Sequence, residues 1–243
     1  MDIWSNNVIA RDIYEFVGLV NKYNVCNLFN VNTLIGVADS LPDVAHCEIE
    51  GIEIEFYNYK PISKTVPKIK YFKINLINSI LSNPDADIKT QDPINKCTFD
   101  LIVTGFCYHD TEKEYINCWH LDKHIREEGD GDAKYSHPLY HFQYGGKNMN
   151  ELTDTGDTLL MGAPRIPHPP MDIFLAIHFI LNNYFNKNDS DYACLQDLFA
   201  DTDYQDILET AKNRMWYPYF KGLSNSENND LNLENLFPLA VST

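Results

Sequence analysis

The chain has 243 residues, of which 44% are hydrophobic and 13% aromatic. This composition excludes a largely disordered protein and provides enough apolar side chains for a buried core. Asp and Glu outnumber Lys and Arg by 35 to 19, giving a formal net charge of −16. Such a charge argues against non-specific nucleic-acid binding, which depends on cations that neutralise phosphates, and it suits solubility or a basic protein partner.

The cysteine usage and the apolar runs indicate a cytoplasmic protein without a membrane anchor. None of the six cysteines forms a C-x-x-C pair, and no signal peptide is recognisable at Met1. We therefore expect reduced thiols in the core. The longest apolar run, IFLAIHFIL at 173–181, is too short to cross a bilayer.

The first third of the chain combines one clear helix with a clear strand. Apolar residues recur at helical spacing from Val8 to Tyr23, which predicts an amphipathic helix. Residues 27–43 mix β-branched residues with helix breakers, and we expect a loop with a short helical turn. Ile and Phe alternate with Glu at 47–57, a pattern typical of a half-buried strand.

The middle of the chain predicts a sheet. Residues 68–82 open with strand-like alternation, but the apolar run beyond Asn75 fits a strand or a helix equally well. Residues 98–108 are apolar on both faces, as in a central strand. Residues 114–146 form a hairpin whose strands are 114–124 and 135–146, joined by 125–134. Together, residues 98–145 predict a three-stranded antiparallel meander.

The predicted hairpin places its histidines on one face, because alternate residues of a strand point the same way. We call this the histidine face; it carries His120, Asp122, His124, His137, Leu139, His141 and Gln143. The other face is mostly aromatic and holds Trp119, Leu121, Tyr140, Phe142 and Tyr144. One register that matches like faces sets His120 opposite His141 and His124 opposite His137. A slip by one residue would mix the two faces, so register parity is constrained.

The last third predicts helices. Four prolines stiffen residues 164–170 and fix Arg165 and His168 in place. Helices follow at 171–185, at 192–199 and at 202–215, the last opened by a capping box of Thr202 and Gln205. The aromatic residues Trp216–Phe220 are expected to fold back on the helices, followed by a polar stretch at 224–230 and a docking tail at 233–241.

These elements predict an α+β fold. A mostly antiparallel sheet, with its meander around 98–145, packs against an N-terminal helix and C-terminal helices. We expect a single domain at 1–221 and a polar, partly mobile tail at 222–243.

The histidine face is a candidate metal site. Cross-strand neighbours lie about 5 Å apart at Cβ, so facing histidines could supply two ligands to a divalent transition metal. The two candidate pairs are His120 with His141, and His124 with His137. Residues four apart on a strand are separated by about 13 Å, so the four histidines cannot share one ion. Asp122, or His168 and Asp172 from the proline segment, would complete a single site.

A metal-free alternative stays open. Two imidazoles and a carboxylate can divide the general-base and general-acid roles near neutral pH, because free His titrates near about 6.5. Arg165 would then stabilise an anionic transition state and His168 would complete the pocket, unless the proline segment is only a connector. Cys118 falls on the same face, but a buried, inert thiol is the commoner state of a cysteine.

The sequence favours a cytoplasmic hydrolase that acts on a phosphoester, like a nuclease or a phosphodiesterase. Its expected catalytic residues are His120, Asp122, His124, His137, His141, Arg165 and His168, with His120 and His141 as the metal ligands in the metal-dependent form. The alternative is a non-catalytic acidic interaction protein, for example one component of a multi-protein bacterial system. It would bind its partner through the acidic surface or through Trp216–Phe220.

Overall fold

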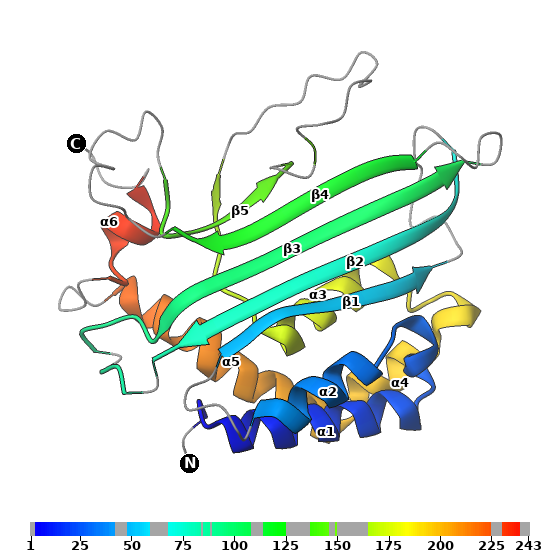
Figure 1. Ribbon diagram of the computed structural model, residues 1–243, viewed down its shortest axis with the longest axis horizontal. Coiled ribbons are helices and arrows are strands. Elements are labelled where there is room, and N and C mark those ends of the chain that lie inside the picture. The colour runs from blue at the N-terminus through cyan, green and yellow to red at the C-terminus, as the bar shows by residue number, and fades with distance from the viewer. Residues whose placement is uncertain are drawn as a thin grey trace.

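The fold is α+β, as predicted, and is built on one six-stranded antiparallel sheet (Figure 1). This computed structural model describes residues 3–41, 48–58, 68–83, 85–87, 89–107, 114–124, 137–145, 149, 165–224 and 230–238. The predicted hairpin connection at 125–134 and most of the polar stretch at 224–230 lie outside these residues.

The strands follow one another in chain order, so the sheet is a simple meander. They are β1 (Glu48–Asn58), β2 (Ile69–Ser82), β3 (Ile94–Cys107), β4 (Glu114–Lys123), β5 (Tyr140–Tyr144) and β6 (Ile166–Pro167). Every neighbouring pair is antiparallel. The predicted strand at 47–57 and the meander at 98–145 are therefore confirmed, and the meander extends to both sides.

Strand β2 resolves the ambiguity that the sequence leaves beyond Asn75. Its residues pair with β1 on one side and with β3 on the other, as far as Ser82. Alternate side chains, from Phe72 through Leu76 to Ile80, are buried. Pairing on both edges satisfies the backbone of this apolar run, which therefore stays extended although its sequence also suits a helix.

The helices gather on one side of the sheet, as Figure 1 shows. They are α1 (Asn6–Lys22), α2 (Asn32–Ser40), α3 (Ile173–Tyr184), α4 (Cys194–Ala200) and α5 (Thr202–Gly222), with α6 (Leu233–Leu236) at one end and short 3₁₀ turns at Val25–Leu28 and Ser190–Tyr192. The predicted helices at 8–23, 171–185 and 192–199 are confirmed. Phe179 of α3 meets Phe99 and Phe142 edge to face, which identifies the aromatic face of the hairpin as the core side.

Two local predictions for helices are wrong. Residues 32–40 form helix α2, longer than the short helical turn expected within a loop, because Leu34 and Ala38 bury an apolar stripe in the core. Helix α5 does not end near Met215: it continues to Gly222 and includes Pro218. Proline there removes one backbone hydrogen bond, and burial of Pro218 and Tyr219 keeps the helix continuous.

Helix α5 also starts differently from the prediction. Its N-cap is Asp201, whose side chain accepts hydrogen bonds from the backbone N–H groups of Asp203 and Tyr204. Thr202 is the first helical residue, so no capping box with Gln205 forms. An Asp directly before the helix supplies the same acceptor one residue earlier.

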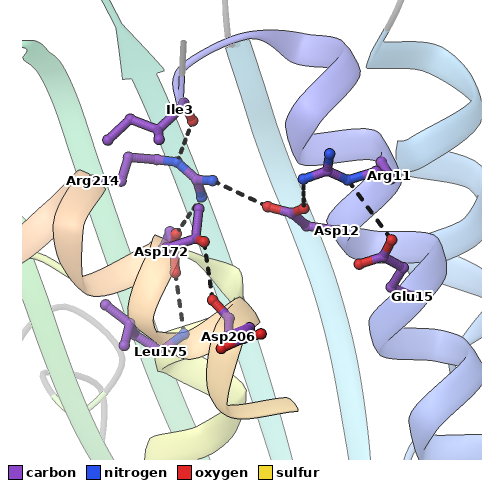
Figure 2. A network of polar contacts seen from close by, with 9 residues as sticks. Ile3, Arg11, Asp12, Glu15, Asp172, Leu175, Asp206 and Arg214 are labelled. Atoms are coloured by element: carbon purple, nitrogen blue, oxygen red, sulfur yellow. Dashed lines mark hydrogen bonds and ion pairs between the residues drawn. The ribbon is translucent and has the colours of Figure 1, made fainter. Parts of the chain in front are cut away.

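A buried ionic network joins the N-terminal segment to two helices (Figure 2). The guanidinium of Arg214 in α5 is 2% exposed and donates from Nη1 to Asp172, 2.8 Å away, and from Nε to the carbonyl of Ile3. Its Nη2 lies 3.5 Å from a carboxylate oxygen of Asp12 in α1. Asp172 also caps α3 by accepting from the N–H of Leu175. Residues far apart in sequence are thereby fixed around one charge.

The C-terminal residues that are described pack on the rest of the fold. Leu231 and Leu236 are buried, and the N–H of Leu139 donates to the carbonyl of Asn235. The backbone of Leu231 lies directly over Gly222. The division into a domain at 1–221 and a tail at 222–243 stays a prediction.

The five cysteines in the described part of the chain are free thiols, three of them buried, and Cys47 lies outside that part. No described helix combines the length and apolar character needed to cross a bilayer.

Candidate metal centre

The site lies on the histidine face of β4 and β5, which is the side of the sheet turned away from helix α3. Along β4, Trp119 and Leu121 face the helices, so His120 and Asp122 face the other way. On β5, Phe142 packs against α3, so His141 and Gln143 share the face of His120. The separation of the two faces is confirmed.

The predicted register is wrong by two residues, although its parity is right. His120 pairs with Gln143, and Asp122 pairs with His141. The aromatic side explains the choice: in this register the Trp119 ring stacks on Phe142 at 5.1 Å and meets Tyr144 edge to face. Alternation along the strands excludes odd slips, but packing between particular rings selects among the even ones.

The observed register brings a carboxylate between two imidazoles. His120, Asp122 and His141 each offer one ligand atom, and these atoms lie within 4.8 Å of one another. Nε2 of His141 is 3.0 Å from Oδ1 of Asp122. Because bonds from zinc to N or O are about 2.0–2.2 Å, two ligand atoms of one ion lie roughly 3.0–3.5 Å apart. The pair already has this spacing.

Two atoms of this group lack hydrogen bonds. Oδ1 of Asp122 and Nδ1 of His141 are buried without a hydrogen-bond partner in the described part of the chain. The 3.0 Å contact between Asp122 and His141 therefore lacks the alignment of an N–H···O bond. His141 is only 2% exposed, and buried polar atoms are normally satisfied by protein, water or an ion. Oδ1 of Asp122, which faces Nε2 of His141, is therefore a buried acceptor that an ion could satisfy, and the group has the donor atoms of a metal site.

The other two histidines lie closer than the strand rise suggested. The His137 ring is 4.7 Å from that of His141 and stacks at 3.7 Å on that of His124. His137 precedes β5, which begins at Tyr140, so the separation of about 13 Å expected along a regular strand does not apply. The rings form one continuous series, in the order His120, His141, His137, His124.

Arg165 is positioned beside this series, and His168 is not. Strand β5 pairs with β6 through His141 with Pro167 and Phe142 with Ile166. Extending this register by one residue places Arg165 opposite Gln143. Its charge acts on His137. The ring of His168 instead packs 5.4 Å from Phe142, on the helix side. Asp172 is also absent from this group, because it caps α3 and binds Arg214.

The electrostatic environment favours an ionised Asp122 and a neutral His137. Burial raises the pKa of Asp122, but the adjacent His141, with His120 and His137, outweighs it and leaves the pKa below its ordinary value. Burial, aided by His124 and Arg165, lowers the pKa of His137 to about 4. Near pH 7 both groups are in the state that binds metals.

Cys118 does not have the character of a nucleophile. It lies on the histidine face, opposite Ile102, but it is buried. Burial, assisted by the charge of Asp100, raises the pKa of its thiol to about 11. The thiolate is the reactive form of cysteine, so this residue is inert near neutral pH.

Gln143 falls on the histidine face by strand alternation, but the sequence pattern assigns it no role. The structure sets it directly opposite His120 and buries it, with 6% exposure. A signal was present, because a glutamine in an otherwise aromatic strand and on the face of His141 is a polar group that needs a partner.

No protein-family model, curated protein or solved structure matches the chain. The functional assignment therefore rests on the geometry and chemistry of the histidine face.

Proposed function

We propose that His120, Asp122 and His141 bind a divalent transition metal and that the site hydrolyses a phosphoester. The observation that carries this proposal is the 3.0 Å approach of Nε2 of His141 to Oδ1 of Asp122, where Oδ1 is buried and has no hydrogen-bond partner among the described residues. Two imidazoles and one carboxylate are a ligand set used by catalytic zinc sites, which keep a further position open.

A phosphoester is the substrate class that fits the surroundings best. A metal ion held here would act as a Lewis acid and generate the attacking nucleophile from water at neutral pH. The water oxygen bonds to phosphorus, the ester P–O bond breaks, and the proton released by the water passes to the leaving oxygen. Arg165 supplies a fixed positive charge next to the ligands, where negative charge develops.

Metal content of the purified protein tests the proposal first. After incubation with zinc and removal of excess ion, elemental analysis should find about one zinc per chain in the wild-type protein. Asp122→Asn and His141→Ala should each lose most of it, because two remaining ligands bind a single ion weakly. His168→Gln is the matched control: it removes a histidine on the other side of the sheet and should keep the metal.

Turnover of a chromogenic phosphate ester tests the catalytic part separately. The zinc-loaded wild-type protein should hydrolyse it, and the two ligand variants should not, while circular dichroism verifies that they remain folded. Stoichiometric metal that survives in both Asp122→Asn and His141→Ala would refute the metal centre. Bound metal without turnover of any phosphoester would refute the hydrolase.

A second candidate function is supported by two exposed aromatic residues. Within Trp216–Phe220, Trp216 donates from Nε1 to the carbonyl of Pro170 and Tyr219 is buried, but Tyr217 and Phe220 are exposed on α5. Such side chains are enriched at protein interfaces. Under this alternative, Tyr217→Ser with Phe220→Ser should abolish binding of a basic partner protein, while His141→Ala should leave that binding unchanged.

A further inference from the structure

Polar groups beside the ligand triad remain without hydrogen bonds in the described part of the chain. Nε of Arg165 is a buried donor atom with no partner. The amide of Gln143, opposite His120, is 6% exposed, and no hydrogen bond of this side chain joins it to another described residue. A buried donor left unsatisfied costs roughly 1–3 kcal/mol, so Nε of Arg165, next to the candidate ligands, points to a bound molecule that accepts hydrogen bonds. Gln143 is placed to donate to the same molecule.

The two donors come from neighbouring strands and face the same way. Gln143 is on β5, and Arg165 immediately precedes β6 and continues its register opposite Gln143. Cross-strand neighbours lie about 5 Å apart at Cβ. This separation allows a guanidinium and an amide N–H to reach different oxygens of one tetrahedral anion, and Arg binds phosphate through a planar fork of donors.

We propose that Gln143 and Arg165 form a phosphate-binding wall next to the metal ligands, and that the substrate is a small phosphate monoester. This inference rests on the proposed metal centre and names its substrate class. The ligands His120 and Asp122 are on β4, and His141 is on β5, the strand that also carries Gln143. Arg165 follows on the next strand, so a phosphate bound at the metal would have its non-bridging oxygens within reach of both donors.

The charges around the wall select a small anion over a polynucleotide. The row of paired residues that crosses the sheet at His120 continues through Asp100 on β3 and Ile77 on β2 to Glu53 on β1. Two of these residues are acidic, and the whole chain carries a net charge of −16. A nucleic-acid strand lying along this face would meet carboxylates where its phosphates need cations. A monoester exposes its charge only at the wall.

Hydrolysis of a phosphate monoester at this site would need only water as the second reactant. Water attacks phosphorus, the P–O bond to the alcohol breaks, and the alcohol leaves with the proton that the water gives up. Inorganic phosphate, the second product, retains the oxygens that Arg165 and Gln143 hold. Inorganic phosphate is therefore a suitable probe of the wall even though the alcohol part of the substrate is unidentified.

Calorimetric titration of the zinc-loaded protein with inorganic phosphate tests the inference. Arg165→Gln and Gln143→Leu should each weaken phosphate binding by about tenfold or more, as expected for losing one hydrogen bond to a charged group. Their zinc content should match that of the wild-type protein. His168→Gln again serves as the control and should bind phosphate normally. A single-stranded oligonucleotide added in excess should not compete.

The possible failures can be told apart. Zinc uptake with phosphate affinity unchanged in both variants would refute the wall and leave the metal centre in place. Competition by the oligonucleotide would refute the preference for a small monoester. A wild-type protein that takes up no zinc would refute the metal centre, and the wall as part of it.

Discussion

His178 shows how one side chain can serve the core instead of a site. It lies in α3, within hydrogen-bond distance of the hydroxyl of Tyr204 at 2.9 Å, and its ring meets Phe199 edge to face. Burial, aided by Lys212 and Lys187, lowers its pKa to about 4. It therefore stays a neutral packing residue down to about pH 5, where an exposed histidine is mostly protonated.

This residue gives the fold a defined pH dependence. Between pH 6.5 and pH 4 the unfolded chain protonates His178 and the folded chain does not, so the free energy of unfolding falls as the pH falls through this range. Its contribution to that loss is roughly 2–3 kcal/mol at pH 4.5.

Urea denaturation at pH 7 and pH 4.5 measures the effect. His178→Gln should lose less stability between these two pH values than the wild-type protein. An identical loss in both proteins would contradict the assignment. His141→Gln is unsuitable as a control, because it alters the candidate metal ligands.

At the scale of single elements, the end of α5 is held by a close backbone contact. A Cβ atom built on Gly222 would lie 2.4 Å from the carbonyl oxygen of Leu231. Leu231 precedes helix α6. The carbonyl of Asn235 in α6 accepts a hydrogen bond from the N–H of Leu139, just before β5. A glycine at this position therefore allows the C-terminal residues to dock.

We expect Gly222→Ala to destabilise the protein by roughly 1–3 kcal/mol, because backbone must shift to admit the methyl group. Gly18→Ala is the matched control in helix α1, where an added Cβ meets no atom within 4 Å. It should be neutral or stabilising by roughly 0.5–1 kcal/mol, since alanine favours the helix. Thermal denaturation of both variants is decisive: equal stability would show that the contact at Leu231 yields without cost.

At the scale of the whole molecule, Arg214 joins segments that are separated by most of the chain. It binds Asp172 at the start of α3 and the carbonyl of Ile3, and it faces Asp12 in α1. Burial raises the pKa of Asp172, although Arg214 opposes that shift. The network positions the N-terminal and C-terminal helices on the same side of the sheet and leaves the histidine face free of them.

Replacing Arg214 by Met should cost about 3–5 kcal/mol, because it leaves Asp172 buried without its counter-charge, whereas Asp12 keeps its ion pair with Arg11. Lys212→Met is the control, since it removes a partly exposed cation from the same helix and should change stability by less than about 1 kcal/mol. Urea denaturation at pH 7 gives both values. A loss below 1 kcal/mol for Arg214→Met would mean that Asp172 finds another partner or takes up a proton.

The sequence by itself determined the fold class, most of the elements and the two faces of the hairpin. These properties depend on the periodicity of the sequence. Successive side chains of a strand point to opposite faces, which separates His120 and His141 from Trp119 and Phe142 regardless of which strand lies alongside. The elements it missed were decided by burial. Helix α2 and the last turns of α5 form because tertiary packing outweighs the local signals of breakers and of Pro218.

Only the tertiary structure decided how the candidate site is composed. Stacking of Trp119 on Phe142 selected the register that sets Asp122 opposite His141. His137 lies before the first residue of β5, so it is not held at strand spacing and its ring contacts that of His141. The register of β6 places Arg165 on the same face as Pro167 and the site. It places His168 on the opposite face, where its ring packs against Phe142. Periodicity assigns a residue to a face, whereas contacts between residues distant in sequence determine which of its neighbours it meets.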